Sequence, residues 1–326
     1  MPDGDTRGKL FTALLAIIVL SVLFAVISAG CIRHNITSPV TPAATVHATK
    51  TLTVIIPQAT ATITRTFTSL PTPTITSTLC LPAFSWGASG TGNGQFGTIM
   101  SIAANPAGDC YVLEKTRVQK FKQDGTYITQ WGSHGSAPGQ FDWANGIAVG
   151  GSGNVYVLEA NNHRVQKFDP DGNYLTNWPC GSAKSIAVDG ADNAYVVTDC
   201  ACLDTQVIKY DSAGNSLTQW FSNWATVTNG IAAGGGNVYI GVFTGGEFNR
   251  FTDTGTELDT CYIPGGSLAA DTAGNAIAAA GSQIYKAAPD CTILKTWQST
   301  NAGWIATGGG GYIYAAYLYT VQVFAP

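Results

Sequence analysis

Charged residues are scarce in this sequence. Asp, Glu, Lys and Arg make up 11% of its 326 residues, whereas about a quarter is usual for a soluble protein. This scarcity, together with 38 Gly, argues against a helical bundle. Thr, Ser, Asn and Gly supply the polarity instead, which is typical of an all-β exported protein.

Basic residues are scarcer than acidic ones, and the formal net charge is −4. Residues 80–326 hold 11 Lys and Arg against 18 Asp and Glu, a net charge of −7. Because an acidic surface repels phosphate backbones, nucleic acid is not an expected partner.

Motifs that bind metal ions are missing as well. None of the eight Cys lies in a CxxC motif, and Cys200 and Cys202 are too close together for the usual zinc knuckle. The His residues are too few and too scattered to complete a site: His34, His47, His134 and His163. We therefore expect no metal and no cofactor, and we expect the cysteines to form structural disulfides or buried thiols.

Residues 10–30 form an uncharged apolar run that follows Arg7 and Lys9. The run is long enough to cross a bilayer as a transmembrane helix. It also ends in Ser-Ala-Gly-Cys at Cys31, which resembles the lipobox of prokaryotic lipoproteins, although Ser28 stands where most lipoboxes carry an aliphatic residue. Residues 1–31 are thus either a cleaved signal peptide with a lipidated Cys31 or a retained membrane anchor. Both alternatives place the rest of the chain on the extracytoplasmic side of the envelope.

The segment 32–78 is rich in Thr, Ser and Pro and has no sustained hydrophobic period. Such a composition cannot bury a core, and it is commonly O-glycosylated at cell surfaces. We interpret this segment as a disordered stalk between the membrane and a folded domain.

Internal repetition dominates the remaining 248 residues. The clearest copy, residues 131–178, contains GIAVG, NVYVLE, RVQKF and YLTNW, four short β-type segments separated by turn residues. A period near 40 residues with four such segments is typical of a β-propeller blade. Successive copies close at equivalent positions: Trp131, Trp178, Trp220, Cys261 and Trp297.

The last copy lacks its fourth strand. Only 29 residues follow Trp297, enough for three strands. Residues 79–86 precede the first blade and end in the same aromatic residue, so we expect them to complete the last blade and close the ring. The sequence thus predicts an all-β fold over 79–326, a six-bladed propeller with four antiparallel strands per blade.

The segment 138–178 resembles the NHL-repeat family nearly throughout, and blade 1 resembles it in GQF, GDCYVLE and TRVQKFKQDG. The resemblance covers residues 79–326 but is strong only as far as Trp220. It implies a six-bladed propeller whose loops bind proteins, RNA or small ligands, and a few members of the family are lyases. The resemblance and the spacing together indicate that Glu114 with Arg117, and Glu159 with Arg164, hold the loop between the second and third strands.

An enzyme of this kind is not favoured by the residues present. Lyase relatives hold a metal with histidines from several blades, whereas residues 79–326 contain only His134 and His163. No GxSxG motif marks a catalytic serine. We therefore assign no catalytic residue.

Aromatic residues occur in the loops before each innermost strand and in the loops between second and third strands. In the predicted topology these loops share one face, and low-charge aromatic loops are typical of recognition surfaces. The candidate ligand-binding residues are Trp224, Phe243, Trp304 and Tyr319.

The same topology suggests a disulfide. Cys180 follows an outer strand, and Cys200 and Cys202 follow a second strand, so their connections emerge on one face. We expect Cys180 to pair with Cys200 or Cys202.

These observations favour an envelope-anchored, extracytoplasmic propeller that binds a protein or a glycan at the cell surface. The alternatives are a propeller lyase or hydrolase and a purely structural envelope protein.

Overall fold

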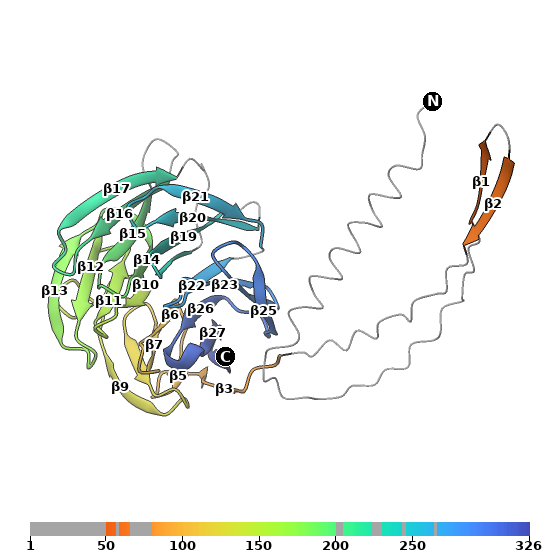
Figure 1. Cartoon of the computed structure of the whole chain (residues 1–326). Helices are drawn as coiled ribbons and strands as arrows, with labels where there is room; N and C mark the ends of the chain where they lie inside the picture. Colours follow the sequence, from red (N-terminus) through yellow and green to blue (C-terminus); the bar gives the residue numbers. More distant parts are fainter. Residues whose placement is uncertain are drawn as a thin grey trace. The chain divides into compact units, whose positions relative to one another are not determined.

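The computed structural model describes residues 50–56, 59–65, 80–199, 205–222, 230–242, 246–263 and 266–326. From Cys80 onwards the strands form six four-stranded antiparallel sheets, set around a central axis as blades (Figure 1). The innermost strands contact one another in ring order, and that of blade 6 contacts that of blade 1. The prediction of an all-β six-bladed propeller is therefore confirmed.

Blades 1 to 3 follow the repeat closely. Each second strand consists mostly of buried aliphatic and aromatic residues, and each third strand mixes such residues with Gln and Lys. Blade 1 comprises β6 (Ser101–Ala104), β7 (Cys110–Leu113), β8 (Val118–Phe121) and β9 (Tyr127–Trp131). Blade 2 comprises β10 (Ala144–Val149), β11 (Val155–Glu159), β12 (Arg164–Phe168) and β13 (Tyr174–Pro179). Blade 3 comprises β14 (Ala183–Val188), β15 (Ala194–Asp199), β16 (Thr205–Tyr210) and β17 (Ser216–Ser222).

Blades 4 to 6 keep the same strand count with less regular sequences. Blade 4 comprises β18 (Ile231–Gly234), β19 (Asn237–Val242), β20 (Glu247–Thr252) and β21 (Glu257–Cys261). Blade 5 comprises β22 (Ser267–Ala270), β23 (Ala276–Ala280), β24 (Gln283–Ala287) and β25 (Ile293–Gln298). Blade 6 comprises β26 (Trp304–Thr307), β27 (Ile313–Tyr317), β28 (Thr320–Phe324) and β3 (Phe84–Trp86).

The ring closes where the sequence predicts. β3 pairs antiparallel with β28, with Trp86 opposite Val321 and Phe84 opposite Val323. The N-terminal strand therefore completes blade 6, and the outer edge of β28 is paired. Between β3 and blade 1, the short strands β4 (Ala88–Ser89) and β5 (Gln95–Phe96) pair in parallel.

A separate unit lies in residues 31–79. Its described part is an antiparallel hairpin of β1 (Lys50–Ile56) and β2 (Ala59–Arg65). Thr alternates there with aliphatic residues, a pattern that suits strands. This hairpin was not predicted from the sequence, and the stalk as a whole stays a prediction.

No helix among the described residues is long and apolar enough to span a bilayer. Residues 1–49, which contain the apolar run and the lipidation candidate Cys31, lie outside the described residues. The anchor therefore stays a prediction from the sequence.

Each blade packs on the next through the residue that closes it. The Trp178 ring of blade 2 lies against Gly214, in the last turn of blade 3, where an added Cβ would come within 2.6 Å of the ring. Gly214 has φ +89°, so glycine suits both the turn and the close approach. The same stacking joins three further pairs, each across one blade boundary: Trp86 with Gly125, Trp131 with Gly172, and Trp220 with Gly255.

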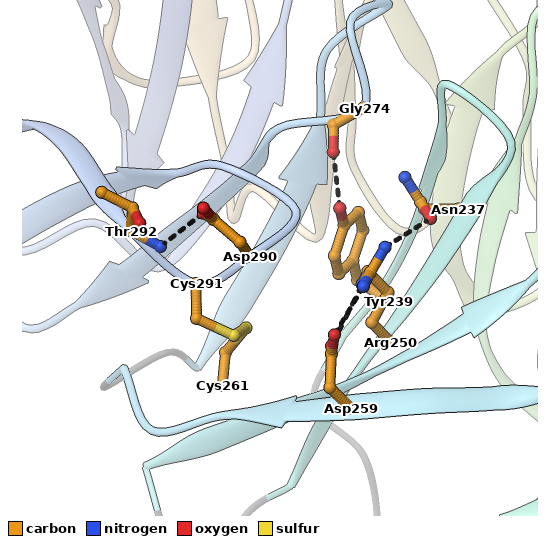
Figure 2. The surroundings of a disulfide bond; sticks show 9 residues. All are labelled: Asn237, Tyr239, Arg250, Asp259, Cys261, Gly274, Asp290, Cys291 and Thr292. Atoms are coloured by element: carbon orange, nitrogen blue, oxygen red, sulfur yellow. Dashed lines mark hydrogen bonds and ion pairs between the residues drawn. A yellow bond between two sulfur atoms is a disulfide. The ribbon is translucent and has the colours of Figure 1, made fainter.

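A disulfide replaces this stacking between blades 4 and 5. Cys261 closes blade 4 and Cys291 lies in the last turn of blade 5, and the two form a disulfide with a Cα–Cα distance of 5.4 Å (Figure 2). Cys261 pairs with Phe248 as Trp178 pairs with Val165, so it occupies the tryptophan position. Cys291 has φ +66°, as the turn glycines do.

The disulfide predicted at Cys180 is wrong. Cys180 is a free, buried thiol, and Cys200 and Cys202 lie outside the described residues. Its side chain packs in the core shared by blades 2 and 3 beside Trp178 and Tyr210, rather than facing the loops. Burial raises the pKa of this thiol to about 12. The described disulfides are instead Cys261–Cys291 and one at Cys80.

Candidate functional site

The two ends of the propeller carry different connections. Neighbouring strands of a blade are antiparallel. The loop that enters the innermost strand of a blade and the loop between the second and third strands of that blade therefore emerge on one face. We call this the loop face, and the opposite end, with the other two turns of each blade, the turn face. Of the four ligand-binding candidates, Trp304 and Tyr319 belong to loop-face segments, whereas Trp224 and Phe243 lie outside the described residues.

A cavity of about 300 Å³ runs between the six innermost strands. At its loop-face end, equivalent positions of five blades carry a small residue, whereas blade 6 carries Trp304. The five small residues are Ser101, Gly146, Ser185, Gly230 and Ser267. In all six strands the next residue is Ile or Leu, which fixes this alignment. Trp304 is therefore the one large side chain in a ring of Ser and Gly.

Trp304 is half-buried. Part of it packs against the core shared by blades 6 and 1, and it also lines the cavity. Tyr319, the other described candidate, packs against the same core without lining the cavity. The structure thus brings both residues to one side of the ring but places only Trp304 in the cavity.

Two further polar residues line this end and were not among the residues predicted from the sequence. Asn145 and Lys184 precede the small residues of blades 2 and 3 by one position. We define the channel mouth as Ser101, Asn145, Lys184, Ser185, Ser267 and Trp304. Repeat alignment could have found both, since they are the polar residues immediately before the innermost-strand motif.

Asn145 has an incomplete set of hydrogen bonds. Its Nδ2 donates to the carbonyl oxygens of Ala183 and Lys184, each at 3.4 Å. Its Oδ1 is buried and accepts no hydrogen bond from the described residues. Because buried acceptors are normally paired, this oxygen is a place for a donor from a bound molecule or water.

The described cavity lining contains no Asp, Glu, His or Cys. Its polar side chains are those of the channel mouth together with Thr307, whose Oγ1 donates to the Ala270 carbonyl at 2.7 Å. These residues offer neither a carboxylate or imidazole for acid–base chemistry nor a metal-ligand set. The chemistry available here is hydrogen bonding and contact with one aromatic ring.

The predicted loop pairs belong to the loop face. Arg164 Nε donates to Glu159 Oε1 at 2.6 Å, and Arg164 also donates to carbonyl oxygens of the loop before β10, including Ser136 O at 2.7 Å. Glu159 accepts from the backbone N of Asp142 at 3.0 Å. Each pair therefore ties the second-to-third strand loop to the loop that enters the blade.

The pair of blade 1 repeats this arrangement. Arg117 Nε donates to Glu114, and Arg117 Nη2 donates to Gln95 O at 2.9 Å. Glu114 Oε1 accepts from the backbone N of Gly97 at 2.8 Å. The loop face of blades 1 and 2 is therefore held in place by backbone-directed hydrogen bonds.

Trp143 is an exposed aromatic residue on the loop face that was not among the candidates. Its side chain is 46% exposed, and Lys115 Nζ lies 3.9 Å from its ring centroid. Its φ of +53° is unusual for a bulky residue, and the backbone is fixed because Trp143 O accepts from Ala160 N. Trp143 does not line the cavity. It is a useful counterpart to Trp304 on the same face.

The turn face, in contrast to the loop face, repeats one type of turn in several blades. Asp169 Oδ1 accepts from the backbone N of Asp171 and of Asn173, and Asn173 Nδ2 donates to Asp169 Oδ2. The hydrogen bond from the Asn173 side chain lowers the pKa of Asp169. The same Asp-to-Asn turn recurs three times: Asp189–Asn193, Asp211–Asn215 and Asp271–Asn275. These carboxylates accept hydrogen bonds within their own turns. We therefore assign them a structural role.

Comparison with known proteins supports the repeat assignment. Residues 141–168, within blade 2 and the loop before it, match the NHL repeat. The resemblance inferred from the sequence is thereby confirmed. Among curated proteins there is no significant match.

Several solved structures share the fold at low identity. A gluconolactonase from Xanthomonas campestris has a TM-score of 0.52 and 15% identity, over 69% of this chain and 86% of that one. Virginiamycin B lyase from Staphylococcus aureus has a TM-score of 0.50 and 15% identity, over 72% and 84%. The WD40 repeats of RRP9 have a TM-score of 0.56 and 9% identity, over 74% and 98%. At these identities the likeness is one of fold alone.

Proposed function

We propose that this six-bladed propeller with an NHL repeat is an envelope-anchored, extracytoplasmic recognition module that binds a protein or a glycan on its loop face. The observation that carries the proposal is Trp304, a half-buried aromatic residue where five other blades have Ser or Gly. Regular packing of the ring does not require a large residue there. A partly exposed aromatic side chain at the rim of a cavity is the usual kind of binding anchor.

The rigidity of the surrounding loops supports the same proposal. Glu159 and Arg164, like their blade 1 counterparts, hold the loop-face backbone by hydrogen bonds rather than leaving it to solvent. A preorganised surface loses less conformational entropy when a partner binds. The apolar run before Cys31 supports placing this surface outside the cytoplasm.

Recognition is favoured over catalysis by the residues of the cavity. Its described lining lacks the carboxylate, imidazole and thiol groups that hydrolases and lyases use as acids, bases or metal ligands. We therefore assign no catalytic role to any described residue.

The test is a screen of immobilised glycans and envelope proteins with the full-length chain, repeated with two variants. Trp304→Ser introduces the residue that three other blades carry at this position, and Trp143→Ala removes an exposed aromatic residue of the same face. A ligand of the loop face should lose about thirtyfold in affinity with at least one variant. A ligand whose affinity neither variant changes, or the absence of any ligand, would contradict the proposal.

A further inference from the structure

Leu318 occupies a turn position on the loop face that favours glycine. It begins the two-residue loop between β27 and β28, which is closed by the pairing of Tyr317 with Thr320. The corresponding two-residue loop of blade 5 begins with Gly281, at φ +57°. Leu318 has φ +51°, a backbone conformation that is strained for leucine and not for glycine. The chain therefore keeps a leucine where its own repeat offers an unstrained alternative.

Packing within the propeller does not account for this leucine. Leu318 is 51% exposed, and Tyr317 beside it is 39% exposed. The backbone of the turn is nevertheless fixed, because Leu318 O accepts from Ile99 N at 3.3 Å. The turn tip, which we define as Tyr317 and Leu318, thus presents an aromatic and an aliphatic side chain to the outside from a fixed backbone.

Blade 6 carries no charged side chain. Residues 79–108 and 296–326, which include all four of its strands, contain no Asp, Glu, Lys, Arg or His. Each of the other five blades carries at least four Asp, Glu, Lys or Arg residues. Because a charged side chain loses hydration when it enters a lipid bilayer, blade 6 is the blade best suited to approach one.

The two side chains of the turn tip fit a lipid surface better than the other classes of partner. Tyrosine is enriched where a protein meets the boundary between lipid and water. The aliphatic Leu318 offers no hydrogen bond to a sugar, and leucine is under-represented among the residues that dominate protein interfaces.

The chain also enters the propeller beside this turn. Cys80 O accepts from Gln298 N at 3.0 Å. Gln298 ends β25, and this outer strand of blade 5 ends on the loop face, next to blade 6. Leu81, the residue after Cys80, is 59% exposed. The predicted stalk and membrane anchor precede this point, so the anchoring chain is attached on the loop face beside blade 6.

We propose that the turn tip docks on the lipid bilayer that anchors the chain, with the Leu318 side chain inserted among the headgroups and upper acyl carbons. This inference rests on the anchoring that is part of the proposed function. So small a contact is weak by itself, but a tether raises the local concentration of the bilayer and makes weak docking sufficient. Trp304 lines the cavity, whereas the turn tip does not, so ligand binding and docking use different side chains.

The test reconstitutes the full-length chain in phosphatidylcholine vesicles, with and without bromine on the upper acyl carbons, which quenches a nearby indole. Leu318→Trp adds an indole at the turn tip, and His163→Trp is the matched control. His163 is exposed in the corresponding loop of blade 2 and has φ +51°, as Leu318 has. Brominated lipid should remove about half or more of the fluorescence added by Leu318→Trp and almost none of that added by His163→Trp.

A further variant asks whether Leu318 serves the bilayer or the fold. Leu318→Gly introduces the residue of blade 5, so the melting temperature should stay unchanged or rise by about 1 to 4 °C. In a chain that carries Tyr317→Trp as the reporter, adding Leu318→Gly should reduce quenching by brominated lipid about twofold or more. A melting temperature lowered by more than about 5 °C would show that the fold holds Leu318 and would overturn the proposal.

The vesicle experiment also separates docking from anchoring. Equal quenching of the two added indoles, or quenching of neither, in a chain that stays with the vesicles would overturn the docking and leave the anchoring intact. A chain that does not stay with the vesicles would contradict the anchoring in the proposed function, and the docking with it.

Discussion

Blades 1 to 3 and blades 4 to 6 share one plan but are joined by different contacts. In the first half, a tryptophan stacks on a turn glycine at every boundary, as Trp178 does on Gly214. In the second half, the corresponding pair of positions between blades 4 and 5 holds the Cys261–Cys291 disulfide. Trp297, which closes blade 5, instead donates its Nε1 to Ala325 O at 3.3 Å, near the chain end.

The partner of the basic residue in the third strand also differs between the two halves. In blades 1 to 3 it reaches the last turn of the next blade, as when Lys209 Nζ pairs with Asp253 at 2.9 Å. In blade 4 the equivalent Arg250 turns back to Asp259 of its own blade, with Nε to Oδ1 at 3.0 Å (Figure 2). In blade 5 Lys286 pairs with Asp271, also in its own blade. The positions that join the blades therefore persist, while the chemistry at each position changes.

The largest expected effect comes from breaking a tryptophan contact of the first half. Trp178→Ala removes a buried ring between blades 2 and 3 and leaves a cavity, so we expect a loss of about 3 to 5 kcal/mol in the free energy of unfolding. Denaturant unfolding measures it. A loss below about 1 kcal/mol would show that the stacking does not hold these blades together.

The disulfide of the second half should contribute nearly as much. Replacing both Cys261 and Cys291 with Ser releases a link across 30 residues, for which the chain-entropy estimate is roughly 3 to 4 kcal/mol. The double change Cys261→Trp with Cys291→Gly restores the pair found at the other boundaries. It should be more stable than the double serine variant, because a tryptophan and a glycine fit the same positions. Equal stability of the two double variants would contradict the positional equivalence.

A smaller effect is expected from the loop pair of blade 2. Glu159 is fully buried and accepts hydrogen bonds from Arg164, Gln166 and the backbone of Asp142. Glu159→Gln should cost about 2 to 3 kcal/mol, since the bonds lost involve a charged acceptor. The matched control is Glu247→Gln in blade 4, where Glu247 stands at the Arg164 position, and it should change stability by less than about 0.5 kcal/mol. Comparable losses in both variants would remove this difference between the halves.

The smallest expected effect is a loss of stability at acidic pH. Burial opposes ionisation of Asp271, but hydrogen bonds from Asn275 and Lys286 outweigh it and lower its pKa, and the pKa of Asp169 is lowered by its bond to Asn173. A lowered folded-state pKa stabilises the fold above the unfolded-state value of about 4, and this contribution is lost as the pH falls below it. Denaturation midpoints should therefore decrease as the pH is lowered below about 4. Asp271→Asn should make this decrease smaller. Midpoints independent of pH between about 5 and 2 would contradict it.

The fold was predictable because the strands and turns of each blade are recognisable from local sequence patterns. The alternation in segments such as RVQKF and the recurring turn residues define strands without any tertiary information, and the unpaired third strand of the last blade points to residues 79–86. The disulfide was not predicted, because strand topology alone shows which face a cysteine is near, not how it is buried. The alignment of the closing residues already placed Cys261 at the tryptophan position, and aligning the last turns of the blades would also have placed Cys291 at the glycine position.

The candidate site was predicted only in part. Trp304 was singled out as a loop aromatic, and the structure places it at the channel mouth. Asn145 and Lys184 were overlooked. Repeat alignment places both just before the innermost-strand motif, but the unsatisfied oxygen of Asn145 is visible only in the structure. Trp143 was noticeable as a loop aromatic, but its left-handed backbone and its contact with Lys115 appear only in three dimensions.

The central claim is that Trp304 departs from the repeat for recognition rather than for packing. The most direct measurement is the free energy of unfolding of Trp304→Ser, determined beside Trp178→Ala under the same conditions. We predict that Trp304→Ser costs at most about a third of the loss at Trp178, because serine is the residue that three other blades carry there and the ring is only half-buried. A loss as large as that of Trp178→Ala would make Trp304 a core residue and would contradict the claim.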